Sequence, residues 1–429
     1  MAGAGPCAGL YVGPHAVNCR CACGILEPAQ PVCGNYRMPP SYSTDIVIFG
    51  GGVAGLWLLN RLTAEGYQAI LLERDRLGGG QSINSQGIIH GGLKFALHGA
   101  LGDASRATAD MPQRWRDSIE GHGEIDLSAC RVLSPHFLLW SGAGMGAGMK
   151  AFLGSKAIAG KTAQAAPDEI PEILRGRGAV YRLPDFVLDS SSLIEALSAP
   201  QRNRIQRVDA DSSQFIHLGD KRNLRVRIDE EPVEIQARRY VFCAGEGNEK
   251  LIEQAGLTRP PGCQLRPLKM VSVSSSTLPP LFTHVLGEGL AANPALTVTS
   301  HRNAEDEPVW YLGGELAEAG AARSEEEQEE TAKGLLRKLF PNLEIDDMHW
   351  RCLDINRAEP ASARGRRPDN AAIASEDDII VAWPTKLTLA PALADIVLQH
   401  LRDEGITPEQ HPDSLPDGPS PPHGRPFWS

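Results

Sequence analysis

A short glycine-rich turn between an apolar run and a helical segment constrains the fold of this chain more than any other feature. Residues 46–49 read Ile-Val-Ile-Phe, a continuous apolar run typical of a buried parallel strand. Three glycines follow, and residues 53–65 then carry apolar side chains at helical spacing up to Gly66, which suits a helix end. Residues 68–73 have the composition of a second strand. Together these segments predict a β-α-β unit.

The glycines of the turn fit the G-x-G-x-x-G pattern of dinucleotide-binding proteins. Gly50 permits the tight turn, Gly52 lets the backbone approach a pyrophosphate, and Gly55 lets the helix pack closely on the sheet. The helix N-terminus supplies unpaired N–H groups and positive partial charge for phosphates. Glu73 ends the second strand, where it can accept hydrogen bonds from the ribose hydroxyls of an adenosine. We predict dinucleotide binding; the alternative is a purely structural glycine turn.

The stretch that follows favours FAD over NAD as the dinucleotide. A nicotinamide-dependent dehydrogenase normally continues with further β-α units, whereas residues 78–93 are small, polar and dense in glycine. A loop of this kind can follow a long extended cofactor and offer it backbone and side-chain hydrogen bonds. Ser82, Asn84 and Gln86 are the side chains of this loop that we expect to contact FAD.

Charge and composition exclude several classes of protein. Lysine and arginine number 42 and aspartate and glutamate number 53, so the net charge of −11 disfavours a nucleic-acid-binding surface. No apolar run reaches the roughly 18 residues that a membrane span requires. The first residues also lack the basic start and unbroken apolar stretch of a secretory signal. We therefore predict a cytoplasmic protein without integral membrane association.

Both ends of the chain are predicted to be disordered. Residues 1–43 hold five of the nine cysteines, but these have neither zinc-knuckle spacing nor a histidine pair to complete a site. A metal site there is the disfavoured alternative, and none is predicted elsewhere. Residues 406–429 are predicted to form an extended tail, because seven of the 22 residues from Pro408 onward are proline.

Several further segments, in order between residues 45 and 402, carry a family resemblance. Residues 89–94 resemble the I-H-G-G-L-R segment of FAD-dependent glycerol-3-phosphate dehydrogenases, and residues 84–90 resemble the N-S-G-V-I-H segment of L-2-hydroxyglutarate dehydrogenases. Residues 187–189 are similar to a hydrophobic-x-D-P step, and residues 241–245 to a V-V-A-A-G strand, of one superfamily of FAD-dependent oxidoreductases. Residues 386–388 are similar to the G-K-L-T segment of the glycerol-3-phosphate dehydrogenases. The chain is thus similar to the D-amino-acid-oxidase-like superfamily of FAD-dependent oxidoreductases. The glycerol-3-phosphate dehydrogenases have glycines before the lysine of G-K-L-T, and this chain has Trp383-Pro384-Thr385 there.

The resemblance implies an α/β and α+β fold, with a Rossmann-type FAD-binding domain and a substrate domain built on a mixed β-sheet. Residues 44–94, 186–262 and 351–405 would form the discontinuous FAD-binding domain. Residues 95–185 and 263–350 would form the substrate domain. The residues expected to bind the cofactor are Gly50, Gly52, Val53, Ala54, Gly55, Glu73, Arg74, Ser82, Asn84, Gln86, Ala244, Gly245, Lys386, Leu387 and Thr388.

Three residues are expected to act on substrate or flavin. The resemblance places His90 beside the isoalloxazine, as a general base or hydrogen-bond partner of the substrate, as a covalent attachment point, or only as packing for the flavin loop. Arg357 would bind a substrate carboxylate, unless it forms an ion pair with Glu359 or Asp354. Lys386 would place a positive charge near flavin N1–C2=O and stabilise reduced flavin; the alternative is a surface lysine.

The remaining candidates favour structural roles. His284 and His301 are expected on loops or on the surface of a sheet. Trp310 and Tyr311 could line a pocket, but a core strand is the commoner explanation. Cys243, in a buried strand, is expected to be a small core residue.

The sequence therefore predicts an FAD-dependent oxidoreductase that oxidises a small hydroxy- or amino-substituted substrate by hydride transfer to flavin N5. Electrons would then pass to oxygen, a quinone or another carrier. The rival hypothesis is a flavin-binding assembly or scaffold protein without turnover. An enzyme acting on a modified base in RNA ranks lower, because the acidic charge opposes RNA binding.

Overall fold

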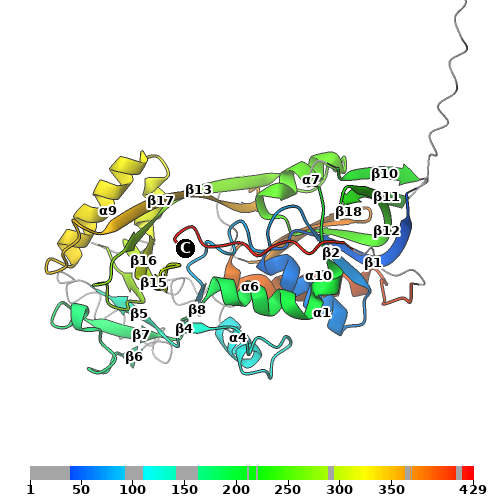
Figure 1. Ribbon diagram of the computed structural model, residues 1–429. Coiled ribbons are helices and arrows are strands. Elements are labelled where there is room, and N and C mark those ends of the chain that lie inside the picture. Colours follow the sequence, from blue (N-terminus) through cyan, green and yellow to red (C-terminus); the bar gives the residue numbers. More distant parts are fainter. Residues whose placement is uncertain are drawn as a thin grey trace, which may run out of the picture. The chain divides into compact units, whose positions relative to one another are not determined.

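The computed structural model describes residues 39–91, 110–141, 163–209, 212–218, 221–287, 294–362, 368, 370–411 and 418–429 (Figure 1). Most of the predicted extension 1–43, and the last three residues of the motif at 89–94, lie outside this description. Strand β1 (Ser41–Phe49) begins earlier than predicted, because its first residues pair with a neighbouring strand. The ordered chain therefore includes part of the predicted extension.

The first sheet has eight strands and contains the predicted β-α-β unit. Its order is β10 (Gln214–Leu218), β11 (Lys221–Ile228), β12 (Glu231–Phe242), β1, β2 (Ala69–Glu73) and β9 (Ile205–Arg207), while β19 (Ile379–Trp383) pairs with both β12 and β18 (Ala372–Glu376). Strands β19, β12, β1, β2 and β9 run parallel to their neighbours in this part of the sheet.

Strand β1 is buried on both faces, which explains its unbroken apolar run. Ile46 and Ile48 pack in the core beneath α1 (Val53–Ala64), α6 (Ser190–Ser198) and α10 (Ala390–Asp403). Val47 and Phe49 face the opposite core, which includes α7 (Asn248–Gln254) and the β10–β12 strands. Side chains alternate across a strand, so a strand covered on both sides needs apolar residues at every position.

The second sheet is mixed and also has eight strands. Its order is β17 (His349–Pro360), β13 (Cys263–Ser274), β16 (Pro308–Gly313), β15 (Leu296–Arg302), β14 (Thr283–Val285), β5 (Phe137–Trp140), β7 (Val180–Leu183) and β6 (Ala163–Gln164). One pair, β14 with β5, is parallel and the other pairs are antiparallel. This confirms the predicted fold class, a Rossmann-type sheet combined with a mixed β-sheet.

The remaining elements connect or cover these sheets. Helix α9 (Glu325–Leu339) starts with a capping box between Ser324 and Glu327 and packs on the second sheet. A small third sheet joins β3 (Ile88–Ile89), β8 (Phe186–Leu188) and β4 (Val132–Ser134). The other helical elements are α4 (Met111–Ile119), α8 (Glu315–Gly320), η1 (Glu172–Leu174), η2 (Ala199–Arg204), η3 (Gly245–Gly247) and η4 (Leu387–Leu389).

Strands β13 and β17 form a long ribbon that runs from the second sheet toward α7 (Figure 1). They pair over their full length, from Cys263 opposite Pro360 to Ser274 opposite His349. The boundary predicted between residues 350 and 351 therefore falls inside a single strand. Helix α4, assigned by sequence to the substrate domain, instead packs with the first sheet's helices, where Trp115 lies 4.6 Å from Trp57 between ring centroids.

The prediction of a disordered tail is wrong for residues 418–429. Backbone hydrogen bonds join Leu77 to Pro422 and Gly424, and Arg207 to Pro419. Trp428 is buried against Tyr311 and His301, with ring centroids 4.5 and 4.6 Å apart. Proline prevents regular ladder pairing, but it does not prevent a chain from burying an apolar anchor at its end.

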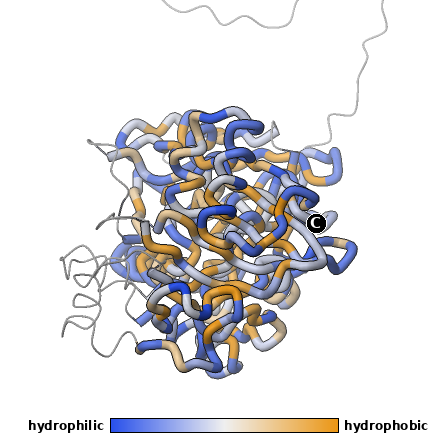
Figure 2. Tube along the Cα trace, turned by 90° about the vertical axis from the view of Figure 1, so that its left-hand side faces the viewer, coloured by the Kyte–Doolittle hydropathy of each residue, from blue (hydrophilic) through white to orange (hydrophobic). Residues whose placement is uncertain are grey.

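Apolar segments run through the interior of the chain in Figure 2, and hydrophilic segments lie toward its periphery. No helix within the described residues combines the length and the apolar character needed to cross a membrane.

We expect Trp428→Ala to lower the free energy of unfolding by about 3–5 kcal/mol, the usual cost of removing a buried aromatic side chain. The measurement is urea unfolding of the FAD-loaded protein. Trp428→Phe, which keeps most of the apolar volume, is the control and should lose much less. Equal stability of all three proteins would contradict an anchoring role for the C-terminus.

His301 makes stability depend on pH. Burial lowers the pKa of His301 to about 4. The unfolded imidazole binds a proton below pH ~6.5, whereas the folded one resists protonation until its lower pKa is reached. Stability is therefore intact above pH ~6.5 and falls as the pH drops toward 4, with a slope of up to about 1.4 kcal/mol per pH unit. Chemical unfolding across this range should show a flatter curve for His301→Gln; equal slopes would contradict the assignment.

Candidate active site

One cavity of about 950 Å³ collects nearly all the predicted site residues. It is lined by the β1–α1 turn, the loop after β2, the end of β12, one face of the β13–β17 ribbon and the segment after β19. Two predicted residues do not line it: Gly55 lies within α1, and Thr388 is fully buried in η4. The predicted residues that line the cavity are Gly50, Gly52, Val53, Ala54, Glu73, Arg74, Ser82, Asn84, Gln86, His90, Ala244, Gly245, Arg357, Lys386 and Leu387.

The glycine turn leaves no room for side chains at two positions. Gly50 has φ +105°, and a Cβ there would lie 2.6 Å from the carbonyl oxygen of Cys243. A Cβ at Gly55 would lie 2.1 Å from the carbonyl oxygen of Gly50. At the N-terminus of α1, Val53 N donates to Ser82 Oγ at 3.0 Å. The turn therefore directs a helix N-terminus and its positive partial charge into the cavity.

Glu73 stabilises this turn through hydrogen bonds to backbone N–H groups. Its Oε2 accepts a hydrogen bond from Gly51 N at 2.6 Å, and its Oε1 accepts one from Asp75 N at 2.9 Å. A carboxylate oxygen can accept more than one hydrogen bond, so Glu73 keeps acceptor capacity for a ribose. Val208, which follows β9, lines the same end of the cavity and was not predicted. Its position depends on the pairing of β9 with β2, which no local sequence signal reveals.

Gly245 and Ala244 lie where the first sheet meets the cavity. Gly245 has φ +60°, a conformation that favours glycine. Asn248 was not predicted: its Oδ1 accepts from Ala244 N at 2.8 Å and its Nδ2 donates to Ala382 O at 3.3 Å, so it ties two neighbouring strand ends together. Cys243 is 7% exposed in the apolar core and its thiol pKa is raised to about 12 by burial, consistent with the predicted structural role.

His90 faces the cavity with its side chain 31% exposed. Its Nδ1 lies 3.0 Å from Asp185 Oδ2, and its backbone N donates to Thr388 Oγ1 at 3.0 Å. The ring of His284 stacks on that of His90, with centroids 5.9 Å apart. His284 is 6% exposed, so the expectation of a surface or loop position is wrong. His301 is also buried, at 8% exposure, and does not line this cavity.

Arg357 lies at the edge of the ribbon's cavity face and pairs with neither of its predicted partners. Its Nη2 contacts Glu318 Oε1 at 3.1 Å. Glu359 instead faces Arg266, and Asp354 faces Lys269. Arg357 Nε is buried and has no hydrogen-bond partner among the described residues. Arg357 as a residue lines the cavity, while this one guanidinium nitrogen lies buried.

Lys386 is half-buried, lines the cavity and is not the exposed surface lysine of the alternative hypothesis. The preceding Thr385 has φ +60°, which is unusual for a β-branched residue. Trp310 and Tyr311 are fully buried core residues of β16 and do not line the cavity, in agreement with the favoured expectation.

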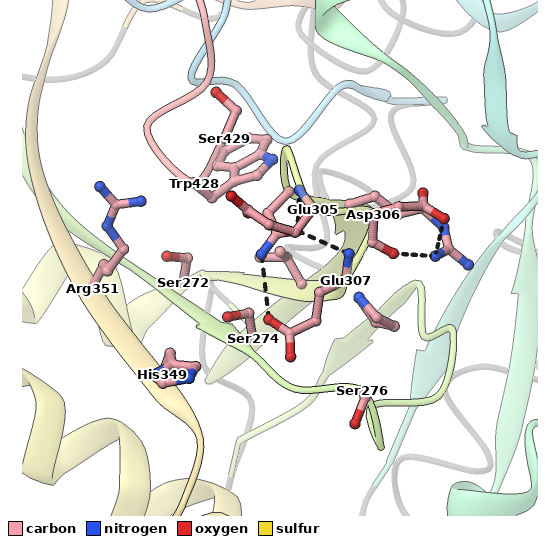
Figure 3. Close-up of a pocket in the computed structure, with 14 residues that line it drawn as sticks. Ser272, Ser274, Ser276, Glu305, Asp306, Glu307, His349, Arg351, Trp428 and Ser429 are labelled. Carbon is pink, nitrogen blue, oxygen red and sulfur yellow. Dashed lines mark hydrogen bonds and ion pairs between the residues drawn. The ribbon is translucent and has the colours of Figure 1, made fainter.

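A second cavity of about 930 Å³ lies on the same face of the ribbon (Figure 3). Met270 and Leu353 are paired and line the first cavity; two residues further along, the pair Ser272 and Arg351 lines the second. Trp428 lines the second cavity and belongs to the same apolar cluster as Met270. None of the predicted site residues reaches this cavity.

The residues around the first cavity fit FAD. They provide a helix N-terminus above a glycine turn for phosphates, a carboxylate at the end of β2 for a ribose, and a glycine-rich loop leading from there to His90.

The family model for FAD-dependent oxidoreductases known as DAO matches residues 45–399. The chain belongs to the DAO family. A probable FAD-dependent oxidoreductase of Pseudomonas aeruginosa, PA4991, is 44% identical over 395 residues, covering 91% of this chain and 99% of that protein. Its crystal structure aligns with a TM-score of 0.78. The predicted flavoprotein, FAD cofactor and oxidoreductase class are thereby confirmed.

Solved structures of much lower sequence identity share the fold. An L-alpha-glycerophosphate oxidase from Mycoplasma pneumoniae with FAD bound aligns with a TM-score of 0.61 at 14% identity, covering 87% of this chain and 99% of that one. A glycine oxidase from Geobacillus kaustophilus aligns with a TM-score of 0.60 at 12% identity, covering 87% and 100%.

We expect Glu73→Ala to weaken FAD binding by about 1.5–3 kcal/mol for each hydrogen bond lost to the ionised carboxylate. Glu73→Gln, which keeps an acceptor but not the charge, should lose less. Titration of the apoprotein with FAD measures the effect. Glu344→Ala, which removes an exposed carboxylate that does not line the cavity, is the control. Wild-type affinity of Glu73→Ala would show that this carboxylate does not contact the cofactor.

Proposed function

We propose that this flavoprotein oxidises a small substrate at a carbon that bears a hydroxyl or amino group. The observation that carries the proposal is an imidazole at the cavity wall, His90, whose Nδ1 is bound to a buried carboxylate. Such a pair leaves the other ring nitrogen directed toward a ligand and suited to accept a proton.

FAD, when bound, supplies the acceptor for the hydride that leaves the substrate carbon. A proton of the substrate hydroxyl or ammonium group passes to His90 Nε2 as the hydride leaves, so a hydroxyl donor gives a carbonyl and an ammonium donor gives an iminium ion. Lys386 adds a positive charge to the cavity wall on the segment after β19. The electrons are passed afterwards to oxygen, a quinone or another carrier.

The wall formed by the ribbon indicates the kind of substrate. Leu268, Met270, Leu353 and Ile355 present apolar side chains to the cavity, and Arg357 follows them on the same face. Arg357 lines the cavity, so its guanidinium can donate to an anionic substrate group while Nη2 stays on Glu318. We therefore propose a small acid, with a carboxylate or phosphate near the oxidised carbon.

The names of the distant structural neighbours support this range of donors. One is a glycerophosphate oxidase, with a hydroxyl donor, and one is a glycine oxidase, with an amino donor. Both compounds are small and anionic at one end.

An anaerobic screen of 2-hydroxy acids, polyol phosphates and amino acids should reveal a compound that bleaches the bound flavin. With that compound, His90→Gln should slow flavin reduction by on the order of 10²–10⁴-fold, the usual contribution of a general base. Arg357→Met should raise the concentration of compound needed for half-maximal rate. Single-turnover absorbance traces give both quantities.

Arg351→Met is the matched control, since Arg351 lies on the same face of β17 but lines the second cavity. Reduction by dithionite should be the same in every variant. If dithionite bleaches the flavin and no small acid does, the rival reading of a flavin-binding scaffold gains support. Full activity of His90→Gln would remove the proposed role of His90.

A further inference from the structure

We propose that Asp185 is a positioning residue that holds His90 in one tautomer, with the proton on Nδ1 and the lone pair on Nε2. The proposal rests on the proposed function, in which His90 Nε2 takes the substrate proton. Asp185 does not line up with any motif of the sequence, and no sequence pattern pointed to it.

Burial and hydrogen bonds hold the Asp185 carboxylate in place. Asp185 is 3% exposed and lies between β7 and β8. Its two oxygens bind two consecutive residues: Oδ2 lies 3.0 Å from His90 Nδ1, and Oδ1 accepts from Gly91 N at 2.9 Å. An ionised carboxylate can only accept hydrogen bonds, so His90 Nδ1 must donate. The proton on Nδ1 leaves Nε2 with the free lone pair.

The absence of a side chain at residue 91 makes this contact possible. A Cβ on Gly91 would lie 2.8 Å from Pro184 Cγ and 3.2 Å from Asp185 Oδ1. A side chain there would push the Pro184–Asp185 segment away from the backbone. The backbone of His90 is held separately, because its N–H donates to Thr388 Oγ1.

Other charged and titratable groups lie around His90, but the described contact of its Nδ1 is with the Asp185 carboxylate. We therefore assign the tautomer of His90 to Asp185. His284 stacks on the ring but its Nδ1 is bonded to Thr297 Oγ1 at 2.8 Å. Arg116 approaches from α4, where it donates to Pro184 O at 3.1 Å and lies over the ring of Phe186. Lys386 lines the same cavity from the position just before η4. The described contacts of His90 Nδ1 are with Asp185.

Replacing Asp185 with asparagine should invert the tautomer rather than merely weaken the contact. Gly91 N still requires an acceptor, so the amide oxygen of Asn stays on that side. The amide NH₂ must then face His90 Nδ1, which can only accept from it. The proton moves to Nε2, the nitrogen that has to be free for catalysis. An asparagine at the corresponding position of the Ser-His-Asp triad acts in this way and lowers kcat by about 10⁴-fold.

Nitrogen-15 spectra of histidine-labelled FAD-loaded protein test the tautomer directly, because the shifts of Nδ1 and Nε2 depend on which nitrogen carries the proton. The chain has 12 histidines, so the signal lost in His90→Gln identifies residue 90. We expect the Nδ1–H form in the wild type and the Nε2–H form in Asp185→Asn. This readout needs no substrate, so it decides the proposal even if no small acid reduces the flavin.

With a reducing substrate in hand, Asp185→Asn should slow flavin reduction by on the order of 10²–10⁴-fold. The substrate concentration at half-maximal rate and the rate with dithionite should stay unchanged. Asp347→Asn removes the same charge at an exposed position outside the cavity and should match the wild type.

Three results would overturn the proposal. One is the Nε2–H form of His90 in the wild type, a measurement that stands even if Asp185→Asn fails to fold. Another is an unchanged tautomer and an unchanged rate in Asp185→Asn. The third is a stoichiometric divalent metal held by the wild type and lost in Asp185→Asn, which would make the carboxylate a ligand instead.

Discussion

The contact between Gly50 and Gly55 is the constraint on which the rest of the structure depends. The backbone of the turn folds back so closely that a single methyl group at residue 55 would collide with the carbonyl of residue 50. This closeness lets α1 begin directly at the end of β1 and pack on Ile48. The helix N-terminus then opens into the cavity that the end of β12 and the loop after β2 complete. A larger residue at either position would separate the helix from the sheet and widen the cavity at the glycine turn.

The end of the cavity where His90 lies depends on strand register in the small third sheet. Ile88 pairs with Val187 and Ile89 with Phe186 in an antiparallel arrangement. Continuing this register by one residue sets His90 against Asp185, so two pairs of apolar residues align an imidazole with a carboxylate. The apolar residues are buried and cannot shift by one position without turning their side chains to the wrong face. Packing between Ile88, Val187 and Phe137 thus supports the position of a neighbouring polar pair.

Features that depend on residues close together in the sequence were predicted, whereas features that depend on pairing between distant segments were missed. The strand, turn and helix of residues 46–64 follow from hydrophobic spacing and glycine, and the structure agrees with them. Asp185 and His284 reach His90 only through the pairing of β8 with β3 and of β14 with β5. The composition of the C-terminal segment indicated disorder, because proline content says nothing about the pocket that receives Trp428. Arg357 lines the cavity, and its role toward substrate stays a prediction; its partner, Glu318, belongs to α8, which sequence spacing does not bring near it.

Thr385 shows how local strain places functional groups. In a regular strand, successive side chains point to opposite faces, so only alternate residues can line one cavity. Here every residue from Ala382 to Leu387 lines it. The left-handed conformation of Thr385, with φ +60°, breaks the alternation and turns the chain from β19 into η4. Such a conformation costs about 1–2 kcal/mol for a residue with a side chain. The fully buried Trp383 on one side and Thr388 on the other hold the turn, and between them Lys386 is kept at the cavity wall.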